Sequence, residues 1–107
     1  MLCSVTIRQL RPGHYDAFRE AWTPQKWLPP VTRVVIGRND ELPDQVLTAT
    51  FVALESAEDA DAMRDEPELL VAEERRLQAI SEHEEAVVFK AVFRVTEEIV
   101  PPTSGSA

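Results

Sequence analysis

Apolar and polar residues alternate at the beginning of the chain. The alternating positions are, in order, Cys3, Ser4, Val5, Thr6, Ile7 and Arg8. Because side chains of an extended chain point to opposite faces in turn, this pattern predicts a strand with one apolar side and one polar side. Pro12 and Gly13 then supply a turn, and the spacing of apolar residues becomes helical.

The first predicted helix covers residues 14–22 and carries an aromatic stripe. The members of the stripe recur at helical spacing and are Tyr15, Phe18, Ala21 and Trp22. Pro24 ends the helix, since proline disfavours helical backbone at the residue before it. Residues 25–30 form an irregular, proline-rich loop that contains Trp27.

Two strands, at 31–38 and 45–54, are predicted on either side of turn-forming residues and should pair as a hairpin. A capping-box spacing over residues 56–59 starts a second helix near Ala57, with Ser56 as the capping residue. Pro67 should break that helix near Asp65 and begin a second helical piece. The apolar side of this piece is expected to carry Leu69, Leu70, Ala72, Leu77 and Ile80. Residues 87–95 form the last strand.

This order predicts an α+β, ferredoxin-like βαββαβ domain: a four-stranded antiparallel sheet with both helices on one face. The domain is expected to span residues 1–98, with a flexible tail at 99–107. Neither side of the strands is polar throughout, so one large apolar face would remain exposed in a single chain. We therefore expect a homodimer formed through the sheet faces, which is a dimeric α+β barrel.

Composition excludes several classes of function. The formal net charge of -8 is unfavourable for tracking nucleic acid, and no apolar run approaches the ~20 residues of a membrane helix. The start of the chain has no secretory signal pattern, so a cytoplasmic location is expected. Cys3 is the single cysteine, which rules out an intrachain disulfide or a thiolate cluster. No metal and no cofactor are expected.

Three segments are similar to one known family. They are the first strand with residues 11–13 and the helix bearing Phe18 and Trp22, then residues 52–63, then the proline-containing helical stretch through Leu77. Together they resemble the antibiotic-biosynthesis-monooxygenase-like branch of the dimeric α+β barrel superfamily. The resemblance covers nearly everything from Leu2 to about Val95. It implies two chains that pack their sheets into a barrel, with a small-molecule cavity between sheet and helices in each subunit.

The family includes haem-degrading enzymes, cofactor-independent oxygenases of aromatic substrates and members without an assigned activity. Haem degradation relies on an Asn in the first strand, a Trp in the second helix and a His ligand beyond it. A gapless comparison places these positions at or near Thr6, Ala62 and Ala72. All three required residues are missing, so haem degradation is disfavoured.

An oxygenase of this family needs a dry pocket and a polar group that ionises or orients an acidic phenol or enol. The catalytic candidates are Thr6 and Arg8, because a guanidinium can stabilise an enolate or phenolate. The residues expected to line the ligand site are Ser4, Tyr15, Phe18, Trp22, Met63 and Leu70. This assignment puts the polar side of the first strand under the helices, whereas simple hydrophobicity would put Cys3, Val5 and Ile7 there.

Alternatives remain for each of these residues. The aromatic stripe is more typical of an ordinary core, and Arg8 is more typical of a solvated charge or a dimer edge. His83 lies among carboxylates in residues 81–85, which favours a solvated acidic turn over a metal site. His14 suits an exposed position or a proton carrier at a cavity mouth. The chain is therefore interpreted as a binder of a small apolar or aromatic molecule, either a cofactor-independent monooxygenase or a non-catalytic ligand-binding or assembly module.

Overall fold

The computed structural model describes residues 1–25, 27, 30–56, 58–59 and 67–102. In chain order its elements are β1 (Leu2–Leu10), α1 (Tyr15–Trp22), β2 (Val31–Arg38), β3 (Gln45–Val52), α3 (Pro67–Ser81) and β4 (Glu84–Arg94). This confirms the predicted ferredoxin-like fold. Among the described residues, neither helix is long and apolar enough to cross a membrane.

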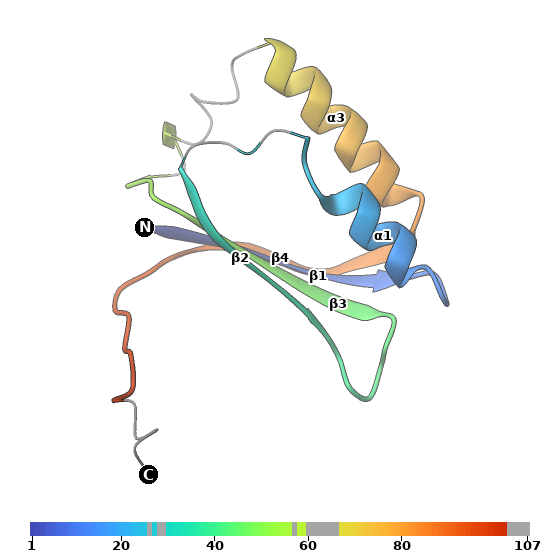
Figure 1. The fold of residues 1–107 in the computed structure, drawn as a ribbon, viewed down its shortest axis with the longest axis horizontal. Helices are drawn as coiled ribbons and strands as arrows, with labels where there is room; N and C mark the ends of the chain where they lie inside the picture. Colours follow the sequence, from blue (N-terminus) through green and yellow to red (C-terminus); the bar gives the residue numbers. More distant parts are fainter. Residues whose placement is uncertain (26, 28–29, 57, 60–66, 103–107) are drawn as a thin grey trace.

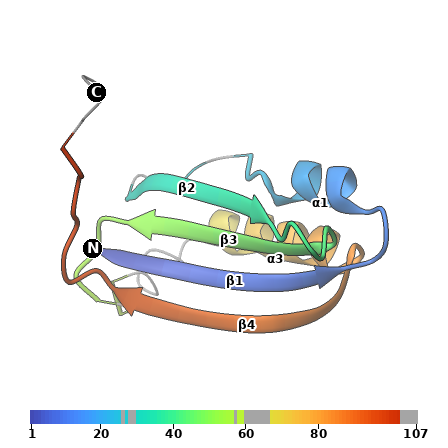
Figure 2. The ribbon, with the colours of Figure 1, turned by 90° about the horizontal axis from the view of Figure 1, so that it is seen from below.

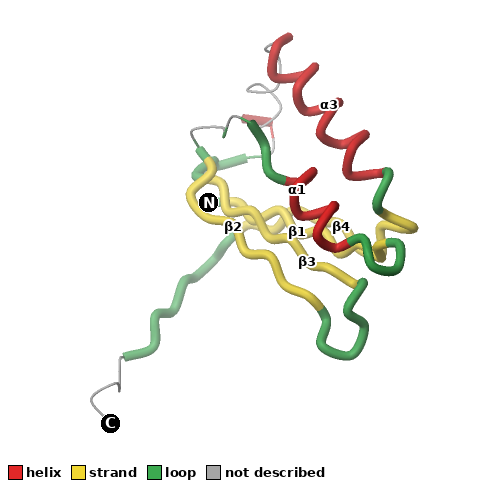
Figure 3. The backbone as a smooth tube through the Cα atoms, turned by 45° about the vertical axis from the view of Figure 1, so that its right-hand side comes forward, coloured by secondary structure: helices red, strands yellow, loops and turns green. Residues whose placement is uncertain are grey.

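The four strands form one antiparallel sheet in the order β2-β3-β1-β4, with β1 and β3 at its centre (Figure 2). Both helices lie on the same side of the sheet, and the other side is left open (Figure 1). Figure 3 shows the two helices beside each other above the strands. The fold is therefore a two-layer arrangement with one uncovered face.

The polar side of β1 faces the helices. Arg8 and Thr6 are buried on that side, together with Thr48 of β3. The register pairs Val5 with Ala49 and with Ala91, so these three residues share the opposite, open face. The resemblance thus gave the right orientation of β1, and hydrophobicity alone would have inverted it.

The core between the layers is small and largely aromatic. Its buried members come from four different elements and are Leu10, Phe18, Trp22, Val46 and Ile80. Phe18 and Trp22 lie one helical turn apart on α1, which explains why the aromatic stripe of this helix points at the sheet. Burial of each such side chain contributes about 1.5–3 kcal/mol, and this contribution holds α1 against the strands.

Several element boundaries follow the sequence closely. β2 has the predicted bounds, and Pro67 is the first residue of α3, where its missing N–H is tolerated. The backbone N–H of Asp59 donates to the Ser56 hydroxyl at 3.3 Å, as the capping box predicts. The expected helix start at Ala57 and the break near Asp65 lie outside the described residues.

The inner side of α3 differs from the prediction. Leu70 and Leu77 are exposed, whereas Ile80 is buried and Arg76 is half-buried. Arg76 lies against the Trp22 ring at 4.8 Å and donates to the Trp22 carbonyl. Apolar residues occur all round α3, so their pattern does not define one face, and the contact with α1 orients the helix instead.

The open face of the sheet is rich in large apolar side chains. Val35, Phe89 and Phe93 are 37%, 42% and 49% exposed on it, and the rings of Phe89 and Phe93 are stacked. Beyond β4 the chain leaves the sheet as an extended segment that carries the exposed Ile99 and Val100 (Figure 1). A single chain therefore exposes several large apolar side chains on one face of its sheet, which is a feature of interaction surfaces.

Candidate functional site

Small hydroxyl side chains cover the centre of the sheet beneath the helices. The cross-strand register pairs Ser4 with Thr50 and Thr6 with Thr48, so all four hydroxyls share the helix side. We refer to these four residues as the hydroxyl patch. Thr6 and Thr48 are buried, and Ser4 and Thr50 are half-buried. The hydroxyl patch is therefore a polar floor beneath the helices, covered over Thr6 and Thr48 and partly open over Ser4 and Thr50.

Arg8 closes one end of the hydroxyl patch. It is only 9% exposed, its Nη1 donates to the Thr48 hydroxyl at 3.2 Å, and its Nε donates to a Glu84 carboxylate oxygen at 3.1 Å. The guanidinium also lies over the ring of Phe18, at 5.6 Å from the ring centre. Arg8 is therefore a buried, oriented cation rather than a solvated charge.

The buried cation Arg8 and the half-buried cation Arg76 share this region of an otherwise acidic protein. Burial lowers the pKa of Arg8, the nearby carboxylate of Glu84 opposes that shift, and the positive charge of Arg76 adds to it. Burial likewise lowers the pKa of Arg76, opposed by Glu73. The two guanidinium groups thus repel each other, and each is paired with a carboxylate, at 3.1 Å for Arg8 with Glu84 and at 2.9 Å for Arg76 with Glu73.

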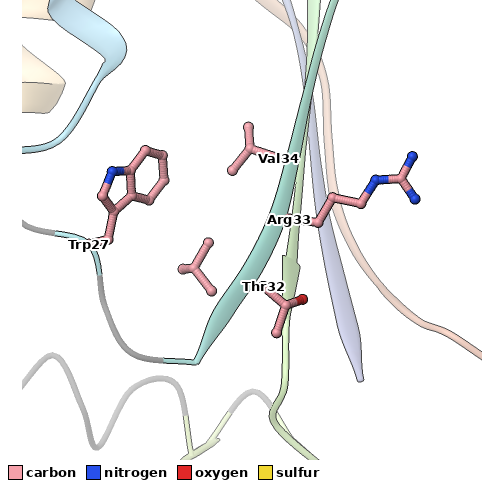
Figure 4. A pocket seen from close by; sticks show the side chains of 5 residues that line it. Trp27, Thr32, Arg33 and Val34 are labelled. Atoms are coloured by element: carbon pink, nitrogen blue, oxygen red, sulfur yellow. The ribbon is translucent and has the colours of Figure 1, made fainter.

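An open hollow of about 260 Å³ lies on the helix side of β2. Its lining residues are Trp27, Val31, Thr32, Arg33 and Val34. Figure 4 shows the Trp27 ring across the hollow from Val34, whereas Arg33 points to the other side of the strand. Val34 is paired with Thr50, so the hollow begins where the hydroxyl patch ends.

Trp27 connects this hollow to the core. Its ring centre lies 6.0 Å from that of Trp22, in a tilted arrangement, and its side chain is 45% exposed. Sequence reasoning left this residue without a position. The sequence shows only an aromatic residue inside a proline-rich loop. The contact between Trp27 and Trp22 depends on the path of the loop to β2, which no local pattern reveals.

The predicted ligand-lining residues of the helices have different positions. Phe18 and Trp22 are core residues, and Tyr15 packs against that core with its ring 4.1 Å from the Arg38 guanidinium. Leu70 is 44% exposed on α3, and Met63 lies outside the described residues. Phe18 and Trp22 thus belong to the packed core, and Leu70 is not among its residues. The ligand-lining role of all these residues stays a prediction.

Three contributors to the site were missed by sequence reasoning. Thr48 and Thr50 share the helix side with Val46 at two-residue spacing, but only the register with β1 reveals the hydroxyl patch. Glu84 was grouped with an acidic turn, yet it pairs with Arg8, 76 residues away. Cys3 is a buried free thiol on the opposite face of the sheet from Arg8.

The fold defines a class: α+β proteins with a ferredoxin-like fold, to which solved antibiotic-biosynthesis-monooxygenase-like proteins also belong. No family model and no curated protein sequence matches the chain. Solved structures do match. A candidate antibiotic biosynthesis monooxygenase from Chloroflexus aurantiacus has a TM-score of 0.70 at 14% identity, over 92% of this chain and 96% of the other.

Two further structures support the same fold. A candidate antibiotic biosynthesis monooxygenase from Nitrosomonas europaea has a TM-score of 0.66 at 13% identity, over 91% of this chain and 100% of the other. A dimeric protein of unknown function with a ferredoxin-like fold, from Bacteroides fragilis, has a TM-score of 0.53 at 17% identity, over 88% and 95%. At these identities the likeness extends to the fold.

Proposed function

We propose that the protein is a homodimeric α+β barrel that binds a small apolar or aromatic molecule with an acidic hydroxyl group between its sheet and helices. The observation that carries the proposal is the buried Arg8 beside the hydroxyl patch. Buried polar side chains are costly in a core that serves packing alone. A polar floor with a fixed cation at one end suits an anionic oxygen on an otherwise apolar ligand.

The activity that suits this site best is cofactor-independent oxygenation. Arg8 would stabilise the enolate or phenolate, with its charge delocalised over the ligand. The carbanion form of the ligand then supplies electrons to O₂. A CH₂ group becomes C=O, one oxygen atom stays on that carbon, and the other leaves as water with the two hydrogens. The protein contributes orientation, charge stabilisation and a dry surface.

A non-catalytic binding module is the second candidate, and the Arg8–Glu84 pair favours it. A carboxylate 3.1 Å from Nε already neutralises the guanidinium, which weakens its attraction for an anionic oxygen. Among the described residues, no hydrogen bond uses Nη2 of Arg8, so this nitrogen is the group that would bind the ligand. Catalysis therefore requires that the ligand contact Arg8 without displacing Glu84.

Ligand binding is tested by quenching of tryptophan fluorescence with anthrone-like phenols and quinols, followed by oxygen uptake with the same panel. Thr50→Val removes a hydroxyl of the patch while its shape stays similar, and it should weaken binding about fivefold or more. Thr96→Val, at an exposed position beyond the end of β4, is the matched control. Binding without oxygen uptake would establish the non-catalytic module. If no member of the panel binds, or if both variants bind like the native chain, the proposed site is wrong.

The homodimer is supported by the apolar open face and by the dimeric protein of similar fold. Sedimentation at micromolar concentration should give twice the chain mass. Phe89→Glu places a charge on the open face and should produce monomers, whereas Leu77→Glu, on the exposed side of α3, should not. A native chain that sediments as a monomer would contradict this part of the proposal.

A further inference from the structure

The two histidines of the chain meet at one corner of the fold, although 69 residues separate them. His14 immediately precedes α1, and His83 lies in the turn between α3 and β4. Their Nδ1 atoms are 3.0 Å apart, and both side chains are half-buried. Neither an exposed His14 nor an isolated His83 in a solvated turn, as the sequence suggested, describes this arrangement.

The two rings are arranged end to end. The ring centres are 5.3 Å apart, which is about the sum of the Nδ1–Nδ1 distance and the distances from each nitrogen to its own ring centre. Both Nδ1 atoms therefore lie close to the line that joins the rings, as in a straight hydrogen bond. One imidazole must donate from Nδ1 and the other must accept there, so the two rings need opposite tautomers.

The same geometry disfavours a metal ion between the rings. An ion bound at the usual ~2.0–2.1 Å would draw both lone pairs to a point beside the connecting line, and the rings would meet at an angle. Within the described part of the chain, no group of three possible metal ligands occurs. The pair is therefore suited to sharing a proton.

Each element that meets at this corner carries charged residues. They are Arg8 and Arg11 from β1 and its following loop, Asp16 from α1, Asp44 from the β2–β3 connection, and Glu82, Glu84 and Glu85 from the turn and β4. The Asp44 carboxylate accepts from the Gly13 N–H at 3.1 Å, and Arg11 donates to the Glu82 carbonyl at 3.1 Å. Protonation of both rings would bring two N–H groups and two positive charges face to face.

We propose that the His14–His83 pair is a proton-sensitive latch that positions Glu84 against Arg8. Glu84 directly follows His83 in the chain and pairs with Leu10 in the sheet register. At neutral pH the latch holds the turn against the start of α1, so Glu84 stays on the guanidinium. When both rings carry a proton, the hydrogen bond between them is lost and the turn is free to shift. The latch operates whether or not a ligand binds.

The direction of the pH effect follows from proton counting. A second proton on the pair would break the hydrogen bond between the rings, whereas the unfolded chain has no such bond to lose. Acid is therefore expected to favour the unfolded state, so the free energy of unfolding should fall as the pH falls. A group that binds protons equally well in the folded and unfolded states would not make the free energy of unfolding depend on pH.

The first test is the tautomeric state, read from long-range ¹H–¹⁵N NMR spectra of the full chain at pH 7.5. One histidine should carry its proton on Nδ1 and the other on Nε2. Two histidines with the same tautomer would overturn the proposal, because no hydrogen bond could then join the two Nδ1 atoms.

The second test compares urea unfolding at pH 7.5 and pH 5.5. Between pH 7.5 and pH 5.5, the unfolding constant of the native chain should rise about five- to tenfold more than the unfolding constant of His83→Asn. The Asn side chain keeps a polar group near the position of Nδ1 but does not titrate. Glu82→Gln, in the same turn, should behave like the native chain. The Arg8 Nε–H resonance should shift with acid in the native chain and not in His83→Asn. Equal pH dependence of native chain and His83→Asn, or an unmoved Arg8 signal, would overturn the latch.

Discussion

The Glu84→Gln substitution probes whether Arg8 depends on a carboxylate partner. It replaces a charged group by a neutral amide of nearly the same shape, 3.1 Å from Nε of Arg8. The side chains of Arg8 and Glu84 are only 11% and 21% exposed. Burial lowers the pKa of Arg8 and the Glu84 carboxylate opposes that shift, so removal of the carboxylate leaves a buried cation without compensation.

The structure sets the size of the effect. A hydrogen bond to a charged group contributes about 1.5–3 kcal/mol, and breaking a fully buried ion pair costs about 3–5 kcal/mol. Glu84 keeps some contact with water, and the amide oxygen of Gln still accepts a hydrogen bond. We therefore expect the free energy of unfolding to fall by about 2 kcal/mol.

Urea unfolding, followed by tryptophan fluorescence at one fixed protein concentration, measures this change, since a dimer would make the midpoint depend on concentration. Glu85→Gln alters an exposed neighbour and should stay within about 0.5 kcal/mol of the native chain. The Arg8→Met, Glu84→Gln double variant should be more stable than Glu84→Gln alone, because no charge is then left buried. A Glu84→Gln variant as stable as the native chain would refute the reasoning.

Three further substitutions test other parts of the fold by the same urea measurement. Phe18→Ala should cost about 3–5 kcal/mol, because Phe18 is fully buried beneath α1; a cost below about 1 kcal/mol would mean that the core is misplaced. Gly13→Ala should cost about 1–2 kcal/mol through backbone conformation alone, since Gly13 has a φ of +78° and an added Cβ would meet nothing within 4 Å; a neutral result would contradict that φ. Arg76→Met should cost about 1 kcal/mol and shift the emission of Trp22, whose ring and carbonyl both contact Arg76, whereas Arg75→Met, at an exposed neighbour, should do neither.

Local pattern was enough to predict most of the elements. The β-branched run at β2 and the proline at the start of α3 fixed their boundaries, because each acts through the backbone of its own segment. β4 begins at Glu84 rather than at Val87. Glu84 pairs with Leu10 and Ala86 pairs with Gln9, with a bulge in the register between the two pairs. Such pairing joins distant segments, and no local signal reports it.

The candidate site was predictable only on the strand whose pattern was unusual. Ser4, Thr6 and Arg8 alternate with apolar residues, so their shared face could be read from the sequence. Their partners Thr48 and Glu84 depend on the register of β3 and β4 with β1, which is set by packing of the whole sheet. The exposure of Leu70 was missed for a related reason: the face of α3 depends on its contact with α1.

One pattern in β1 underlies both the site and the proposed assembly. A sheet usually turns its more apolar side toward its helices. Here the side of β1 that faces the helices carries Ser4, Thr6 and Arg8, and the apolar residues Val5 and Ile7 face away from the helices. The inner face then needs polar partners, which the hydroxyl patch and Glu84 supply. The outer face needs an apolar cover, which a second copy of the sheet would supply. Exchanging the polar and apolar positions of β1 would put apolar residues under the helices and polar residues on the open face. The proposed ligand site and the proposed dimer are therefore expected to be lost together.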